Sequence, residues 1–396
     1  MSAHSLNRDA QRLLSLTDAL SHSGSNLEDS YWEGLLTAQL EKIIGGRKNN
    51  TTESALEHLS RNNPEGYEIL FEQAESLTES LSFERDGQLW DALLFSAPII
   101  AWTRYKLPDG QLDDAQRAAI CQALRKTIVA DDAKLAIASN LLNFDVMPQS
   151  FHETRAWAEQ LAQAAFAGTS HDVNGGRLPA SEGILADTRF IVGAIVVPRG
   201  QALFKWQTSD ANARERRQQC YNDWAHACSA VLDPLFTGCR TEYLGVDAYY
   251  SNNREADHKI RPLVLRAAIA WLHTAVNISS DKLRAVIVGC GDPVIQEYRV
   301  GFSTQSSKAV IYGCLWPVLS KEEAFADLID AGQLSTADEI AAILKEEGVT
   351  EIRRLPGLHA CEYCEDCGAP YFPDALGDMQ HPELPEDANL EPIQFH

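Results

Sequence analysis

The sequence contains no segment that would carry the chain to or across a membrane. Residues 1–7 lack the basic stretch and apolar run of a secretory signal peptide. The most apolar helical stretch, residues 262–276, contains Arg266 and is too short to span a bilayer, which is typical of a buried helix. We therefore expect a cytoplasmic protein whose nine cysteines are reduced thiols.

Positive charge is scarce in this chain. The 396 residues include 34 Lys and Arg against 56 Asp and Glu, which gives a formal net charge of −22. A surface of this sign repels the phosphate backbone of nucleic acids and the headgroups of anionic lipids, so both are disfavoured as partners. The same charge favours a basic protein partner.

Familiar catalytic motifs are also missing. The chain has no serine nucleophile elbow, no His-Glu-x-x-His pair and no glycine-rich dinucleotide fingerprint. Residues 289–292, Gly-Cys-Gly-Asp, follow an apolar run as a phosphate loop would, but the Gly-Lys-Ser/Thr ending of such a loop is absent. The sequence therefore assigns no catalytic residue and no nucleotide cofactor, and it favours a non-enzymatic interaction or scaffold protein.

The patterns that are present predict an α+β fold. The first part has helical periodicity and helix caps, such as Ser25 followed by Glu28, which indicates an all-helical bundle or a solenoid-like domain. A stretch rich in Gly, Pro, Ser and Asn then indicates a linker, and β-branched runs indicate a mixed α/β domain. The expected parts are a helical domain (1–168), a linker (169–183), an α/β domain (184–356) and a cysteine knuckle with an acidic tail (357–396).

The α/β part repeats the order strand–strand–helix–strand. The first set is expected at 190–197, 202–207, 212–235 and 241–246. A long helix at 254–276 separates it from a second set, expected as three antiparallel strands (284–288, 295–302, 309–315), a helical region (321–347) and a strand (351–355). This recurrence is typical of an internal duplication that forms one or two sheets with helices on a face.

The sharpest local motif lies near the carboxyl end and reads Cys361-Glu-Tyr-Cys364-Glu-Asp-Cys367-Gly368. A Cys-x-x-Cys-Gly turn is typical of a metal knuckle, in which backbone amides point at the thiolates and glycine takes a positive φ. Zinc needs two further ligands, and the sequence predicts a structural site of Cys361, Cys364, Cys367 and His381.

A metal-free turn of reduced thiols is the alternative to this site. A redox pair is disfavoured, because the acidic residues between Cys364 and Cys367 raise thiol pKa values, and an iron–sulfur cluster would need a fourth close cysteine. Residues 361–396 include nine acidic residues and no Lys or Arg, which suits a structural or protein-docking role rather than nucleic-acid binding.

Several motifs resemble an uncharacterised betaproteobacterial family known as a domain of unknown function. They are Ser23-Gly-Ser-Asn-Leu-Glu-Asp-Ser-Tyr-Trp-Glu33, Val197-Pro-Arg-Gly200, Arg254-Glu-Ala-Asp-His-Lys-Ile-Arg-Pro262, Tyr312-Gly-Cys-Leu-Trp-Pro317 and Cys364-Glu-Asp-Cys367-Gly-Ala-Pro-Tyr-Phe-Pro373. The resemblance extends over nearly the whole chain. It implies a bacterial cytosolic setting without a mechanism, and it matches Cys364, Cys367 and His381, whereas Cys361 often has no counterpart.

Two charged groups in the α/β part are candidates for a ligand pocket. Arg254, Asp257, His258 and Arg261 share one helix face, and Glu297 and Arg299 share one side of a strand. They predict a site for an anionic or phosphorylated ligand, with His258 as a general base. The structural alternatives are a surface helix with its own salt bridges and the solvent face of an amphipathic strand.

Three functions therefore remain open. The first is an interaction or scaffold protein with a zinc knuckle. The second is an enzyme or binding protein for a small anionic ligand. The third is a self-assembling protein whose sheet edges pair between copies of the chain.

Overall fold

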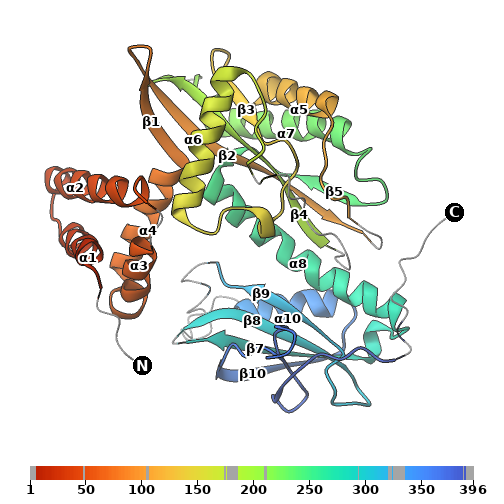
Figure 1. The fold of residues 1–396 in the computed structure, drawn as a ribbon. Helices are drawn as coiled ribbons and strands as arrows, with labels where there is room; N and C mark the ends of the chain where they lie inside the picture. Colours follow the sequence, from red (N-terminus) through yellow and green to blue (C-terminus); the bar gives the residue numbers. More distant parts are fainter. Residues whose placement is uncertain are drawn as a thin grey trace.

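The computed structural model confirms a mixed α+β architecture (Figure 1). It describes residues 6–47, 50–103, 107–173, 175, 186–208, 212–292, 294–319, 323, 335–386 and 388. The predicted linker therefore lies largely outside the described residues, as does the first part of the helical region expected at 321–347, up to residue 334. Among the helices described, none is both long and apolar enough to span a membrane.

The chain begins with a unit of four helices that projects from one side of the molecule (Figure 1). Its first two helices start at the expected kind of cap, because the side chains of Asn7 and Ser25 accept hydrogen bonds from the amides of Ala10 and Glu28. The apolar faces meet in one core that includes Leu13, Leu40, Leu56 and Leu70. The helices are α1 (Arg8–Ser21), α2 (Asn26–Ile44), α3 (Thr51–Asn62) and α4 (Pro64–Glu79).

A first sheet follows, and part of it lies where the sequence predicted only helices. Its main path runs β1-β2-β4-β3 with every pair antiparallel, and β5 and β6 also pair with β2. The strands are β1 (Ser80–Arg85), β2 (Gln88–Trp102), β3 (Lys134–Ile137), β4 (Ala186–Pro198), β5 (Arg240–Tyr243) and β6 (Asp247–Ala248). The prediction of helices throughout residues 1–168 is therefore wrong for β1, β2 and β3.

The reason for this error is that the central strands are buried on both faces. In β2, Phe95 and Ile99 point into one core, whereas Leu94 and Ile100 point into another. A strand covered on both sides has no alternation of polar and apolar residues, so its sequence cannot be told from that of a buried helix.

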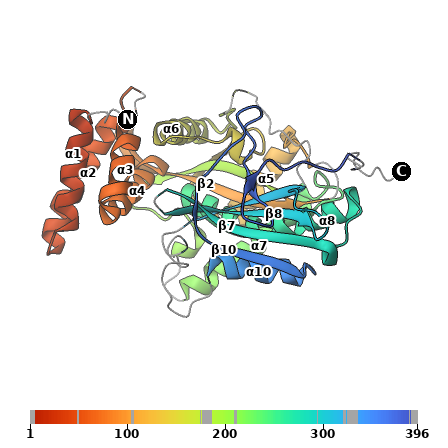
Figure 2. The ribbon, with the colours of Figure 1, turned by 90° about the horizontal axis from the view of Figure 1, so that it is seen from below.

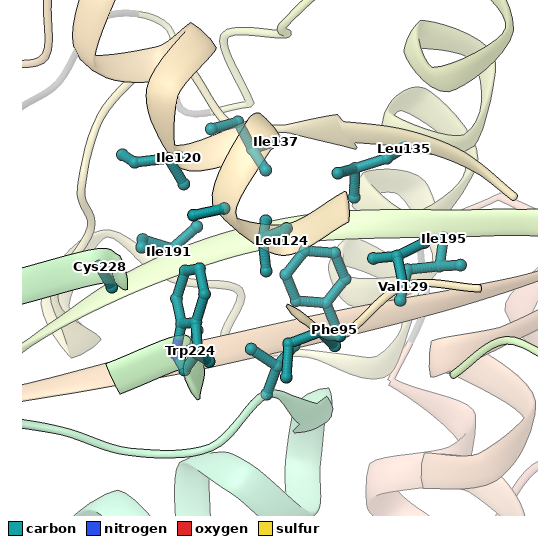
Figure 3. Close-up of a cluster of buried hydrophobic side chains, with 14 of the residues drawn as sticks. Phe95, Ile120, Leu124, Val129, Leu135, Ile137, Ile191, Ile195, Trp224 and Cys228 are labelled. Atoms are coloured by element: carbon teal, nitrogen blue, oxygen red, sulfur yellow. The ribbon is translucent and has the colours of Figure 1, made fainter. Parts of the chain in front are cut away.

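Helices cover both faces of this sheet. On one face Ile120, Leu124 and Trp224 come from α5 (Asp114–Thr127) and α7 (Ala213–Leu232) and pack against Phe95 and Ile191, as Figure 3 shows. The other face is covered by α6 (Phe151–Ala167), which begins at the predicted cap Ser150, and by the first half of α8 (Tyr249–Ala275).

A second sheet has the order β10-β7-β8-β9, in which β10 is parallel to β7 and the other pairs are antiparallel. This confirms the three antiparallel strands and the last strand predicted for this region. The strands are β7 (Leu283–Gly291), β8 (Ile295–Thr304), β9 (Tyr312–Pro317) and β10 (Glu351–His359). One face packs against the second half of α8, through Leu265 and Ile269, and against α10 (Thr336–Glu346).

The first hairpin of the expected duplication does not form. Residues Lys205–Thr208 are a 3₁₀ helix, and β4 pairs with β2 and β3 instead of a strand at 202–207. The two sheets also differ in strand order, so they do not repeat one unit. They are joined by α8, whose two halves contribute to the cores of both sheets (Figure 1).

Candidate metal centre

Residues 361–381 form the knuckle and a short hairpin on the second sheet. The hairpin consists of β11 (Phe372–Pro373) and β12 (Met379–Gln380). In Figure 2, α10 and this segment lie on opposite sides of the sheet. The segment lies very close to the strands. A Cβ on Gly301 of β8 would lie 2.1 Å from the carbonyl oxygen of Pro373. A Cβ on Gly313 of β9 would lie 2.3 Å from the Phe372 ring. Glycine at both positions lets the segment rest directly on the strands.

The knuckle has the local geometry that its sequence predicts. The amide of Gly368 donates to the carbonyl of Cys364 at 2.9 Å, and the amide of Cys364 donates to the carbonyl of Ala369 at 2.8 Å. Gly368 has a φ of 72°, a region that residues with a side chain rarely adopt. The turn therefore brings Cys364 and Cys367 to the same side of the chain.

Three of the four predicted ligands come together. The ligand atoms of Cys364, Cys367 and His381 all lie within 4.8 Å of one another, and Cys367 Sγ is 3.2 Å from His381 Nε2. The hairpin provides this contact, because His381 directly follows β12. The Tyr371 ring packs edge-on near the imidazole, with ring centroids 6.4 Å apart. Two thiols and one imidazole form a donor set that suits zinc.

The electrostatics of the turn favour the thiolate that a metal requires. The backbone amides of Cys367 and Asp366 hydrogen-bond to the Cys364 sulfur and lower the pKa of its thiol, and the Cys367 thiol and the Tyr371 hydroxyl act in the same direction. Donors aimed at the sulfur therefore outweigh the acidic residues between the two cysteines, which the sequence alone suggested would raise the pKa.

Cys361 does not join the other three ligands. It lies two residues after the end of β10, whose last residue, His359, pairs with Cys290 of β7. The Cys361 thiol lies near Glu297 and Arg299 instead, and burial followed by the charge of Glu297 raises its pKa. The expected set of three cysteines and one histidine therefore becomes Cys364, Cys367 and His381 among the described residues, because the end of the sheet holds Cys361 elsewhere.

A buried arginine fastens the segment to the sheet. Arg299 is fully buried, and its Nε donates to Glu297 Oε1 at 2.7 Å. Its Nη1 donates to the carbonyl oxygens of Glu362 at 2.6 Å and Tyr371 at 2.8 Å, and its guanidinium lies 5.0 Å from the centre of the Tyr363 ring. Arg299 thus binds the chain on both sides of the knuckle, and the predicted pair of Glu297 and Arg299 holds the C-terminal segment in place.

Asp374 shapes the hairpin that delivers His381. Its side chain is 2% exposed and accepts hydrogen bonds from the amides of Leu376 at 2.7 Å and Asp378 at 3.0 Å. Its other carboxylate oxygen accepts from Gln380 Nε2 at 2.8 Å. The sequence signal that could have revealed this turn is the spacing of Asp374 and Gly377, which has a φ of 97°.

The charged residues of α8 do not meet Arg299. Arg254 forms an ion pair with Glu75 of α4, whereas Arg261 is buried and pairs with Glu323 through both of its Nη atoms. The second half of α8 packs on the face of β8 that carries Tyr298, whereas Arg299 points to the opposite face, because successive strand residues alternate. The sheet therefore separates the two predicted groups.

The two remaining pocket candidates lie on the same helix face as Arg254 and Arg261. Burial raises the pKa of Asp257 to about 6, although the charge of Arg261 opposes the shift, and His258 is exposed. No hydrogen bond links Asp257 to His258 among the described residues, so the pairing that a general base would need is not formed there.

Comparison with known proteins gives one match. A family model with the description "Protein of unknown function (DUF2863)" matches residues 1–395. Neither the search of curated proteins nor the search of solved structures found a match.

Proposed function

This chain belongs to the DUF2863 family of proteins of unknown function. We propose that it is a non-enzymatic interaction protein in which a structural zinc site holds the C-terminal hairpin on the second sheet. The observation that carries the zinc site is the convergence of Cys364, Cys367 and His381, whose ligand atoms lie within 4.8 Å of one another. All nine cysteines are unpaired, which supports a location in the reducing cytoplasm.

Zinc is the metal that this donor set fits best. Thiolate and imidazole donors select zinc over magnesium or calcium, which prefer oxygen ligands. The role is structural in this proposal, because the ion would join the knuckle to the residue that follows β12 and would close the hairpin over β8 and β9. Binding free energy at such a site contributes directly to the stability of the segment that it closes.

An enzyme that acts on a small anionic substrate has weaker support. The basic candidates Arg254 and Arg261 are already paired with Glu75 and Glu323, and Arg299 lies on the far side of the second sheet. A guanidinium with a carboxylate partner has little charge left for a ligand.

Two exposed apolar side chains on α2 support a protein partner in this proposal. Leu27 is 87% exposed and Tyr31 is 61% exposed, and their spacing of four residues places them side by side on the outer face of the helix. Residues 13–41 contain five carboxylates and no Lys or Arg. An apolar pair in an acidic surrounding fits a basic amphipathic helix, and the projecting position of the unit in Figure 1 leaves room for one.

The zinc site is tested by elemental analysis of protein purified under reducing, chelator-free conditions. We expect about one zinc per chain, loss of the metal in Cys364→Ser and His381→Ala, and retention in the matched control Cys361→Ser. Chelation should also accelerate hydrogen exchange in residues 361–381. Protein without zinc under these conditions would contradict the site.

The partner surface is tested by affinity capture from lysate of the native host at low salt. The double variant Leu27→Ser/Tyr31→Ser should lose a stoichiometric partner that the wild type retains. The control Leu89→Ser changes a residue that is 46% exposed on β2, away from the helical unit, and should retain it. Failure of the wild type to capture any stoichiometric partner would reject the interaction proposal, and equal capture by all variants would reject the surface. Light scattering on the purified protein tests self-assembly.

A further inference from the structure

The three converging donors of the tail leave a zinc ion one ligand short. Structural zinc is almost always four-coordinate and tetrahedral. We propose that a metal held by Cys364, Cys367 and His381 keeps a fourth position on the solvent side, and that this position accepts a neutral nitrogen donor from outside the chain, namely the imidazole of a partner's histidine. The inference rests on the proposed metal site and extends it by naming its external ligand.

The position is open because of how the segment is built. The knuckle and the end of the hairpin supply the three donors, whereas Cys361 lies near Glu297 and Arg299 and does not belong to the group. Among the residues that the structure describes, no further cysteine, histidine or carboxylate belongs to the group. Cys367 is exposed, so the site opens toward solvent.

The charge around the site selects the kind of donor. Two thiolates cancel the charge of Zn²⁺, so the ion with its three ligands is neutral. Glu362, Glu365 and Asp366 are exposed beside it, and residues 361–396 contain no Lys or Arg that could offset them. Carboxylates, phosphates and a further thiolate would therefore enter against like charge, whereas an imidazole adds no charge and is a common zinc ligand.

The site would then act as a docking point. A metal with three ligands from one chain and one from a second molecule links the two without a large interface. The acidic surroundings repel acidic surfaces and favour a histidine that lies within a basic segment, in keeping with the net charge of −22.

The test uses the full-length reduced protein with Co²⁺ in place of zinc, because the visible spectrum of cobalt reports its ligands. Imidazole is titrated at constant ionic strength, and acetate is titrated in parallel. We expect a saturable spectral change with imidazole. Acetate should bind at least about tenfold more weakly than imidazole. Cys361→Ser should behave as the wild type does, and elemental analysis after each titration must show that cobalt is retained.

Three results would overturn the inference. A cobalt spectrum that does not change when imidazole is added would mean that the chain supplies its own fourth ligand. Loss of sulfur-to-metal charge-transfer intensity in Cys361→Ser would identify that ligand as Cys361. Acetate binding as tight as imidazole binding would remove the argument from charge. In each case cobalt is bound and the proposed metal site stands, whereas a failure to bind cobalt would overturn both.

Discussion

Replacing Arg299 by methionine tests how the C-terminal segment is held. The side chain is fully buried and makes three hydrogen bonds, one to the carboxylate of Glu297 and two to the carbonyl oxygens of Glu362 and Tyr371. Methionine is similar in length and apolar, so it fills most of the space but provides no donor. The substitution therefore leaves the half-buried carboxylate of Glu297 and the carbonyl group of Tyr371 without their donor, whereas the carbonyl group of Glu362 keeps the amide of Tyr371 at 3.1 Å.

The size of the effect follows from these partners. Removing one member of a buried ion pair costs about 3–5 kcal/mol, and we expect the lower end of this range because the side chain of Glu297 is 16% exposed. The double variant Glu297→Gln/Arg299→Met removes that charge and should recover part of the loss. It still lacks a donor for the carbonyl group of Tyr371, and such a group costs about 1–3 kcal/mol when it is buried and unsatisfied.

Hydrogen exchange measured by mass spectrometry reports this change locally. A loss of about 3 kcal/mol in the free energy of opening should speed the exchange of peptides within residues 361–381 by about a hundredfold. The matched control is Arg61→Met, which removes an exposed arginine paired with Glu57 on α3 and should cost less than about 1 kcal/mol. If Arg299→Met exchanged at the rate of the control, the proposed role of Arg299 would be refuted.

Three further predictions concern stability. Burial raises the pKa of Glu79 to about 7, so the folded state binds this proton more tightly than the unfolded state and loses stability as the pH rises from about 4.5 to about 7. Glu79→Gln should remove that loss and gain up to about 3 kcal/mol over the wild type at pH 8, with little gain at pH 4.5. Urea unfolding at both pH values checks this, and an equal difference at both would contradict it. Gly301→Ala places a Cβ 2.1 Å from the Pro373 carbonyl oxygen and should speed hydrogen exchange in the hairpin. The control Gly34→Ala on α2, where a Cβ would have no atom within 4 Å, should not change this exchange. Equal exchange in both variants would show that the close approach is unimportant. Asp374→Ala leaves two turn amides without their acceptor and should lower the stability of the hairpin by about 2–3 kcal/mol. It should also weaken zinc retention in competition with a chelator. Unchanged retention would show that the turn does not position His381.

Local features of the fold were predictable from the sequence because their causes lie within a few residues. Ser25 and Ser150 begin helices through their own side chains. The turn at Gly368 needs a residue that tolerates positive φ, and glycine follows Cys367 at that position. In such cases the chemistry of the local segment decides the backbone.

Other features depend on neighbours that are distant in the sequence. The apolar run of β2 reads as a buried helix until β4 and two layers of helices are known. The pair of Glu297 and Arg299 reads as a solvent face until the C-terminal segment is placed on it. A residue's role there is set by what packs against it, which spacing alone does not specify.

The sequence by itself determined the α+β class, the capped helices of the N-terminal unit, the strands of the second sheet and the knuckle with its two thiols. These rest on periodicity, capping and turn chemistry, all of which act over short stretches of chain. Only the tertiary structure decided that Cys361 is held apart from Cys364 and Cys367, and that His381 is brought to them. The physical reason is that a metal site needs atoms within a few ångströms of one another, and the sheet, the buried Arg299 and the turn at Asp374 together set those distances.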